Sequence, residues 1–260
     1  MSPALRIGLP LGALVVILIA WETAVRATGT AGLVPSPVNV ARAGVALIAD
    51  GTATRALAGS LQRVLIGFCV AAVIGVPIGL AIGTAPTLDR IFRPVLDAMR
   101  SVAPIAWIPM AILWLGVRGD AALFVVAYAA VFPFILNASD AARRVDGSLL
   151  AAARSLGAGR ALTFGAVITP SALPFLFTGA RIAMGFAWGS IIAAELAIGI
   201  KVTGQSRAVA GLGQLMVETL YVRRDVDALV FYMLMIGAVS FLIDFGMRRA
   251  QIRLMPWTLR

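Results

Sequence analysis

The segment Leu149–Ile182, LLAAARSLGAGRALTFGAVITPSALPFLFTGARI, lies between long apolar runs and carries arginine but no carboxylate and no histidine. Gly147 and Ser148 are expected to open a short helix at the start of this stretch. Gly157 and Gly159 are expected to end it, because glycine adopts the left-handed C-cap conformation at no steric cost. The stretch therefore predicts a short helix followed by a sharp glycine turn.

A second short helix is predicted after the turn, from Arg160 to about Ile168. It should stop at Pro170, whose nitrogen cannot donate a backbone hydrogen bond. The first helix carries a face of small residues with one leucine, formed by Ala151, Ala152, Ala153 and Leu156. Two short helices joined at a glycine turn make a projection against which another protein can dock, and they offer no catalytic group.

The composition of the chain defines its class independently of that segment. Hydrophobic residues make up 60% of the 260 residues and charged residues only 13%, and the mean hydropathy is +0.96. A soluble protein needs more polar surface than this composition supplies, so we expect a membrane-embedded helical protein. The single cysteine, Cys69, excludes an intrachain disulfide or a thiolate metal cluster, and the chain has no histidine.

Several apolar stretches approach the roughly 20 residues needed to cross about 30 Å of hydrocarbon. The six predicted spans are Ile7–Ala24, Val64–Gly83, Ala103–Val117, Ala121–Asn137, Pro174–Ile198 and Asp227–Met247. An amphipathic helix at about Val40–Ala49 is predicted to lie at the membrane interface. We expect an all-α integral membrane fold with one membrane domain over residues 1–260, in which 1–55 form the first helix and interfacial segment and 56–250 the core.

The placement of basic residues predicts the orientation of the chain. With the N-terminus inside, twelve basic residues fall in the inner segments and nine in the outer ones, and six spans bring the C-terminus back to the same side. Both termini and the segment at about 146–170 are then cytoplasmic. The net charge of +10 does not predict nucleic-acid binding, because the arginines are scattered at the ends of apolar spans, where snorkelling and contact with lipid headgroups explain them.

The opening segment resembles the coupling (EAA) loop of ABC importer permeases of the binding-protein-dependent type. That loop has the pattern Glu-Ala-Ala, three residues, Gly, nine residues, a branched apolar residue, two further residues and Pro. The matching positions here are Ala151, Ala152, Ala153, Gly157, Val167 and Pro170. Two positions depart from the pattern, because Ala151 stands where the family has Glu and Thr169 where it has Leu. The missing carboxylate removes any salt bridge to an ATPase from position 151.

Further stretches are similar to the nitrate/sulfonate/taurine (NitT/TauT) branch of these permeases and follow the order of that family. They include LVPSPVNV, SLQRVLIGFCVAAVIGVPIGLAIG, FRPVLDAMRSVAPIAWIPMAILWLGV, RIAMGFAWGSIIAAELAIG with GLGQLM, and DFGMRRAQIRLMPW. The similarity covers roughly residues 33–257. One departure is the stretch 199–210, containing IKVTGQSRAVA, which is longer than the corresponding run in the family.

This resemblance implies a type I ABC importer transmembrane domain in the bacterial inner membrane. It implies partners of three kinds: a second permease copy in a homodimer, cytoplasmic ATPase subunits that bind ATP and Mg²⁺, and a periplasmic protein that delivers a small anion such as nitrate, bicarbonate, sulfonate or taurine. Membrane lipid is a further partner and nucleic acid is not. The residues expected to couple to the ATPase are Ala151, Ala152, Ala153, Arg154, Gly157, Arg160 and Pro170.

The chain lacks the motifs of an enzyme. It has no phosphate-binding G-x-x-x-x-G-K-[ST] loop, since its only lysine, Lys201, stands in GIKVTG. It has no paired carboxylates, no Ser-His-Asp set and no metal-ligand cluster, so we expect no cofactor in this chain. The alternative function is a secondary transporter or channel that works without ATP, although Glu195 is then the only strong candidate for an intramembrane carboxylate. A membrane enzyme is a third reading, and no catalytic group supports it.

Candidate residues of a translocation pathway lie in the predicted third and fifth spans. Pro104 and Pro109 interrupt the third span around Trp107, and broken spans often mark a pathway, although a kinked packing helix explains each proline slightly better. In the fifth span, residues spaced by seven share one helix face. The pathway candidates are Trp107, Arg181, Trp188, Ser190 and Glu195. Structural alternatives stay open: Glu195 as an interfacial cap or ion-pair partner, and Arg181 as a snorkelling side chain.

Two spacings predict packing rather than function. Glycines recur at multiples of four in the second span, at Gly67, Gly75, Gly79 and Gly83, which lets a neighbouring helix approach closely. In the last span, Asp244 and Arg248 are four residues apart and should form an ion pair on the helix surface.

Overall fold

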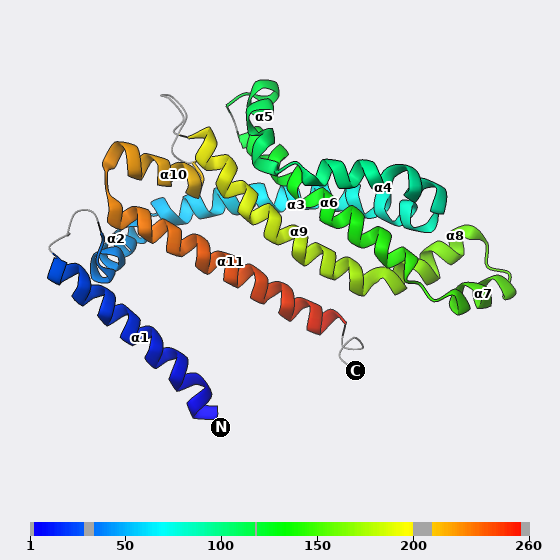
Figure 1. Ribbon diagram of the computed structural model, residues 1–260, viewed down its shortest axis with the longest axis horizontal. Helices are drawn as coiled ribbons and strands as arrows, with labels where there is room; N and C mark the ends of the chain where they lie inside the picture. Colours follow the sequence, from blue (N-terminus) through cyan, green and yellow to red (C-terminus); the bar gives the residue numbers. More distant parts are fainter. Residues whose placement is uncertain (1–2, 29–33, 118, 200–209, 256–260) are drawn as a thin grey trace.

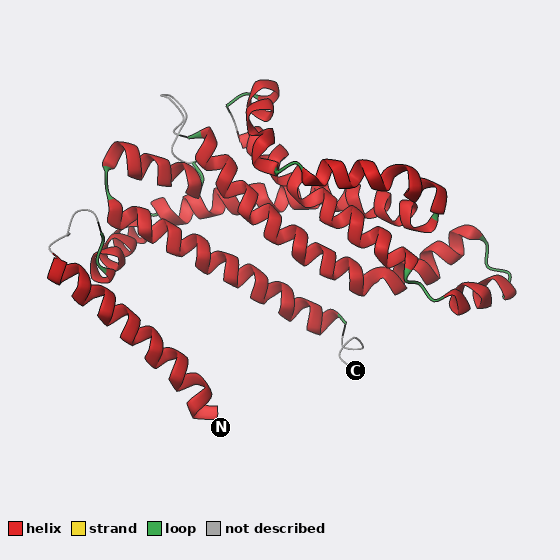
Figure 2. Cartoon of the chain, viewed as in Figure 1, coloured by secondary structure: helices red, strands yellow, loops and turns green. Residues whose placement is uncertain are grey.

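The computed structural model describes residues 3–28, 34–117, 119–199 and 210–255, and in these residues the chain is helical with no strand (Figures 1 and 2). The elements are α1 Pro3–Thr28, α2 Pro37–Ala49, α3 Thr52–Thr84, α4 Pro86–Ser101, η1 Pro104–Trp107, α5 Ile108–Leu115, α6 Gly119–Arg143, α7 Gly147–Ser155, α8 Arg160–Thr163, η2 Phe164–Ile168, α9 Thr169–Ile198, α10 Leu212–Glu218, η4 Thr219–Arg223 and α11 Val226–Leu254. The predicted all-α fold is confirmed.

Helix α6 forms the centre of the bundle, with its most extensive contacts to α3 on one side and α9 on the other. Four glycines of α3 lie in the contact with α6. A Cβ atom added at Gly79 would meet the backbone oxygen of Ile135 and the Cβ of Ala138, and Gly67, Gly75 and Gly83 face α6 in the same way. The prediction that this glycine spacing serves helix packing is therefore confirmed.

Four helices are long and apolar enough to cross a membrane: 52–84, 119–143, 161–198 and 226–254. These contain the second, fourth, fifth and sixth predicted spans. The first predicted span falls within α1, a helix of 26 residues that is about 39 Å long.

The third predicted span, Ala103–Val117, is wrong as a single crossing helix. It covers only the second arm, Pro104–Leu115, of a helix pair whose first arm is Pro86–Ser101, and the two arms are bent by 83° at the break between them. The first arm, α4, carries five charged residues and therefore does not have the hydropathy of a membrane span. The two prolines lie where helices start, because Pro104 begins η1 and Pro109 is the second residue of α5.

The predicted stop at Pro170 is also wrong. The helix that starts after the glycine turn continues without a break through a π-helical turn, η2, into α9, so that residues 161–198 form one helix. In the π-turn the Thr169 N–H donates to the Phe164 carbonyl, five residues back. This wider turn accommodates Pro170, which has no N–H and occupies the first turn of α9.

The two ends of the bundle differ in what they carry (Figure 1). Helices α7 and α8 project from one end, while α2 and α10 lie at the opposite end. The C-terminal part of α11 and the start of α1 point toward the end that carries α7 and α8. The helix expected at about Val40–Ala49 is present as α2, which Ser36 caps by accepting a hydrogen bond from the Asn39 N–H at 3.2 Å.

Candidate functional site

The projecting loop begins with a capped helix and ends in a glycine turn. The Asp146 carboxylate accepts a hydrogen bond from the Ser148 N–H at 2.8 Å, so Asp146 is the N-cap of α7. Gly157 has a φ of +77°, and the Ala158 and Gly157 N–H groups donate to the carbonyls of Ala153 and Arg154, each at 3.0 Å. These two bonds form a Schellman C-cap, which confirms that Gly157 ends the helix.

The surface of this loop combines small and large apolar groups. Ala151 and Ala152 are exposed, whereas Ala153 is buried. Leu156 precedes the glycine turn with 88% of its surface exposed, and the exposed apolar surface also includes Leu149, Leu162 and Phe164. An exposed apolar knob of this kind is typical of a protein-docking surface.

Arg154 and Arg160 are the two arginines predicted to take part in docking. Arg154 is exposed, and its Nε donates to the Leu150 carbonyl one turn earlier at 3.1 Å, which leaves the rest of the guanidinium on the surface. Arg160 begins α8, but its side chain lies outside the described residues. Pro170 lies in the first turn of α9, at the base of the loop rather than at its tip.

The cap on α7 is expected to depend on pH. The hydrogen bond from the Ser148 N–H holds the pKa of the Asp146 carboxyl below its ordinary value. The carboxylate therefore stabilises α7 fully above the ordinary pKa, near 4, and the stabilisation is lost as the pH falls through the lower folded pKa. Amide hydrogen exchange in the first turn of α7, corrected for intrinsic rates, should show protection falling below about pH 4.

The variant Asp146→Asn provides the control, since asparagine caps a helix without titrating. Its protection should stay constant over the same pH range. An equal loss of protection in both proteins would show that the cap is not the titrating group.

Glu195 lies in the centre of a buried polar cluster at the end of the bundle opposite α7. Its carboxylate accepts hydrogen bonds from the Ser60 hydroxyl at 2.9 Å, from the Arg63 guanidinium at 2.5 Å and from the Gly213 N–H at 3.0 Å. The Ser60 oxygen also accepts from the Leu212 N–H at 3.0 Å. Glu195 is 0% exposed and Arg63 is buried, so this cluster joins α3, α9 and the start of α10 in the interior of the bundle.

The close approach of the chain explains the Gly-Leu-Gly sequence at α10. A Cβ atom at Gly211 would collide with the Glu195 carboxylate, and one at Gly213 would collide with the Glu195 Cβ and the backbone of α9. Only glycine lets the backbone pass this close to the carboxylate. Of the two readings that the sequence leaves open for Glu195, the contacts within this chain match the ion-pair reading.

The other pathway candidates of α9 also have partners within the chain. The Arg181 Nε donates to Asp244 at 2.6 Å, and Arg248 donates to the second oxygen of Asp244 at 2.9 Å, which confirms the predicted pair between Asp244 and Arg248. Trp188 is buried, and its Nε1 donates to the Ile236 carbonyl at 3.3 Å. Ser190 is half-buried. The assignment of these residues to a pathway stays a prediction.

Trp107 lies at the sharp bend between α4 and α5, within a group of aromatic rings. Its ring centroid is 5.2 Å from that of Tyr128 and 6.4 Å from that of Trp114. Its indole N–H is buried and has no hydrogen-bond partner among the described residues. The structure therefore brings Trp107 next to α6, and Trp107 is not among the hydrogen-bond partners of Glu195 in the described residues.

The partners that the sequence does not predict are Ser60 and Arg63 for Glu195, and Asp244 for Arg181. Arg63 has no role among the sequence predictions, although it lies inside α3 and is buried. A signal was available: a charged residue within an apolar helix needs a partner, and Glu195 was the matching carboxylate. The pairing itself needs the fold, because 132 residues separate the two.

The long apolar helices define an integral membrane protein, and the projecting loop has an exposed apolar surface on which another protein can dock. Residues 75–256 match the family described as "Binding-protein-dependent transport system inner membrane component". The chain belongs to this family, which confirms the resemblance seen in the coupling loop and places the protein among multi-pass proteins of the inner membrane.

Two curated relatives cover most of the chain. It is 33% identical over 259 residues to the taurine transport system permease protein TauC of Escherichia coli (strain K12), covering 97% of this chain and 90% of the relative. It is 32% identical over 197 residues to the bicarbonate transport system permease protein CmpB of Synechocystis sp., covering 76% of this chain and 67% of that protein. These relatives are permease subunits.

A solved structure shows the same fold. A chain of the inward-facing MetNI methionine ABC transporter superposes with a TM-score of 0.65 at 19% identity, covering 77% of this chain and 94% of that one. The expected fold class, a type I ABC importer transmembrane domain, is therefore confirmed.

Proposed function

We propose that this protein is the permease subunit of an ATP-driven importer and forms the translocation pathway for a small anion of the nitrate, bicarbonate, sulfonate or taurine type. The observation that carries the proposal is the projecting loop 146–170, whose apolar tip at Leu156 is exposed at one end of a helical membrane bundle. Membership of the binding-protein-dependent family and the permease relatives support it.

The assembly we infer contains two copies of this chain, a cytoplasmic ATPase seated on each projecting loop and a periplasmic binding protein at the opposite end. The ATPases bind ATP and Mg²⁺ and supply all hydrolysis, since this chain has no phosphate-binding loop. The end that carries α7 and α8 is then cytoplasmic, together with both termini, in agreement with the excess of basic residues in the inner segments.

The continuous helix from α8 through η2 into α9 supports a mechanism of alternating access. This helix of 38 residues is about 57 Å long and runs from the docking loop to the Glu195 cluster at the other end of the bundle. Closure of the ATPases displaces the loop. Because the helix has no hinge between the loop and the Glu195 cluster, the displacement moves the whole helix. ATP-driven closure opens the cavity outward to receive substrate, and hydrolysis restores the inward-facing state.

The coupling role is tested by the substitution Gly157→Val. Gly157 has nothing within 4 Å of an added Cβ, but its positive φ strains any branched side chain, so the Schellman cap should be lost and the knob deformed. We expect the reconstituted complex to lose most of its substrate-stimulated ATP hydrolysis and transport. The membrane bundle should keep its unfolding temperature, since the loop lies outside it.

Gly246→Val is the matched control, because Gly246 lies in α11 with open space around it and without a positive φ. This variant should keep its transport and its coupling to the ATPase. Normal coupling in the Gly157→Val complex would refute the assignment of the loop.

The face of α9 that lines the pathway is tested by cysteine accessibility, after Cys69 is replaced. Residues 184, 188 and 191, on the face of Arg181 and Glu195, are buried in the single chain, whereas 185, 186 and 189 are exposed. A small aqueous thiol reagent should label the second group in at least one nucleotide state if the exposed face lines the cavity. Labelling of the first group instead would favour the face predicted from the sequence, and no labelling of either group would place the pathway away from α9.

A further inference from the structure

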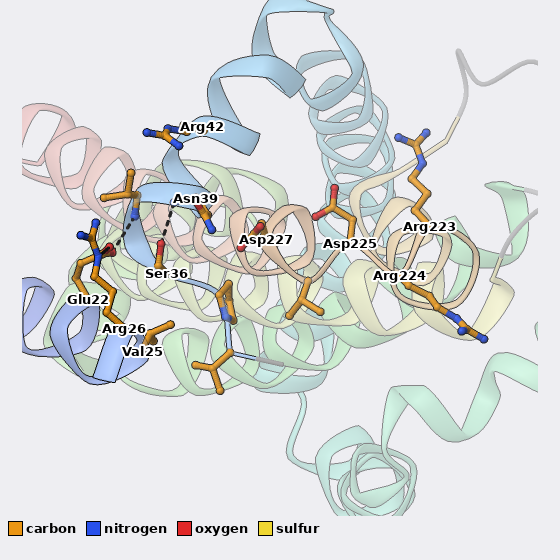
Figure 3. A pocket seen from close by; sticks show the side chains of 14 residues that line it. Glu22, Val25, Arg26, Ser36, Asn39, Arg42, Arg223, Arg224, Asp225 and Asp227 are labelled. Atoms are coloured by element: carbon orange, nitrogen blue, oxygen red, sulfur yellow. Dashed lines mark hydrogen bonds and ion pairs between the residues drawn. The ribbon is translucent and has the colours of Figure 1, made fainter. Parts of the chain in front are cut away.

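A polar cavity of about 820 Å³ lies at the end of the bundle opposite α7, between α1, α2 and the start of α11 (Figure 3). Charged side chains of both signs line it. In the view of Figure 3 two carboxylates lie between two groups of arginines. The charged residues of the lining are Glu22, Asp225 and Asp227, together with Arg26, Arg42, Arg223 and Arg224.

Some of these charges are already satisfied within the chain. Glu22 pairs with Arg26 at 2.6 Å, Arg223 pairs with Glu218 at 2.9 Å, and Asp225 caps α11 by accepting from the Ala228 N–H at 2.9 Å. The remaining charged groups have no ion pair or hydrogen bond with any other described residue. They are Arg42, Arg224 and Asp227. The cavity therefore offers cationic groups and a carboxylate to the same ligand.

An apolar groove of about 390 Å³ adjoins the cavity and is formed by the same three helices. Along α1, Leu18 of the groove lies one turn from Glu22 of the cavity. Along α11, Phe231 of the groove lies one turn beyond Asp227. Going from Glu22 to Leu18 and from Asp227 to Phe231 leads from the end of the bundle toward its middle. The groove therefore continues the cavity into the hydrocarbon region. Trp21 lies at the junction, where tryptophan is common at membrane interfaces.

We propose that the cavity and groove form a binding site for one phospholipid with an amine-bearing headgroup, of the phosphatidylethanolamine class. The lipid phosphate binds Arg42 and the amide of Asn39, which are three residues apart on one face of α2. The lipid ammonium binds the Asp227 carboxylate. One acyl chain fills the apolar groove between α1 and α11.

The shape and lining of the site favour a lipid over other occupants. A soluble anion has no group to fill the apolar groove, which is lined almost wholly by carbon atoms. A helix from a second copy of this chain would fill the groove but leave the unpaired Arg42 and Asp227 buried without partners, which is costly. A phospholipid satisfies both parts, because its headgroup is polar and doubly charged and its chains are apolar.

The test uses the complex purified with its ATPase in detergent, to which phosphatidylethanolamine, phosphatidylcholine or phosphatidylglycerol is added, with bound lipid counted by native mass spectrometry. Wild-type protein should bind phosphatidylethanolamine best. Phosphatidylcholine has no N–H donors on its amine, and phosphatidylglycerol has no amine. Arg42→Ala should weaken binding of phosphatidylethanolamine about tenfold, the effect of one lost charge-assisted hydrogen bond. Asp227→Asn should reduce binding of phosphatidylethanolamine but not of phosphatidylglycerol.

Two further variants separate the headgroup site from general lipid contact. Ala238→Phe fills the groove and should reduce binding of all three lipids, whereas Arg253→Ala, an exposed arginine at the far end of α11, should change nothing. Equal binding of the three lipids, or equal losses in Arg42→Ala and Arg253→Ala, would overturn the proposal. A disulfide between two copies through Met235→Cys in a protein without Cys69 would overturn it in favour of a protein interface.

Discussion

Replacing Arg63 by methionine is expected to destabilise the folded protein by about 3–5 kcal/mol, the cost of leaving a buried charge without its partner. The Glu195 carboxylate is buried, and the Ser60 hydroxyl and the Gly213 N–H cannot neutralise its charge. The free energy of unfolding can be measured by titration with SDS in mixed micelles. The loss should be accompanied by detachment of α10, which this cluster holds against α3 and α9.

A double variant separates the charge effect from a loss of packing. Arg63→Met combined with Glu195→Gln removes both charges, while the amide oxygen still accepts from the Gly213 N–H, so most of the stability should return. Arg253→Met, at an exposed position, should change stability by less than about 0.5 kcal/mol. A single variant within 1 kcal/mol of wild type, or a double variant no more stable than the single one, would contradict a buried ion pair at this site.

Gly79→Ala is expected to cost about 1–3 kcal/mol through overpacking at the contact of α3 with α6. The added Cβ would meet the backbone oxygen of Ile135 and the Cβ of Ala138, and neither atom can rotate out of the way. The two central helices would have to separate, which also disturbs the contact between α6 and α9. The same measurement of unfolding in mixed micelles reports the change.

Gly246→Ala gives the matched comparison for this prediction. Gly246 lies within α11 and has open space around it, so alanine there should be neutral or stabilise by up to about 1 kcal/mol through its higher helix propensity. The two substitutions should therefore act with opposite signs. Destabilisation of equal size in both would show that Gly79 is not at a close helix contact.

The sequence predicts those structural features that depend only on residues close to one another along the chain. The glycine that ends α7, the ion pair between Asp244 and Arg248 and the glycine contacts of α3 follow from spacing along one helix. Four membrane spans are also predicted correctly, because each is one continuous apolar stretch of the chain. The α7–α8 loop could be recognised because its turn chemistry is contained within about twenty residues.

The features that sequence reasoning missed depend on contacts between distant segments or on backbone geometry. The pairs Arg63–Glu195 and Arg181–Asp244 join helices that only the fold brings together. The third span was misplaced because its charged first arm, α4, has the hydropathy of a surface helix. The stop at Pro170 was wrong because a π-turn removes the conflict that proline creates in a regular helix.

The π-turn at 164–168 also sets an angular relation between the two parts of the helix that it joins. Each residue of a helix advances the chain by about 100° around its axis. The extra residue in this turn therefore sets the direction, around the helix axis, in which α7 and the exposed Leu156 lie relative to the buried face of α9. Removal of one residue from the turn would swing the knob by about a quarter of a revolution while leaving its own shape unchanged. The fit of this loop to a partner therefore depends on its rotation about the helix axis as well as on the side chains of the knob.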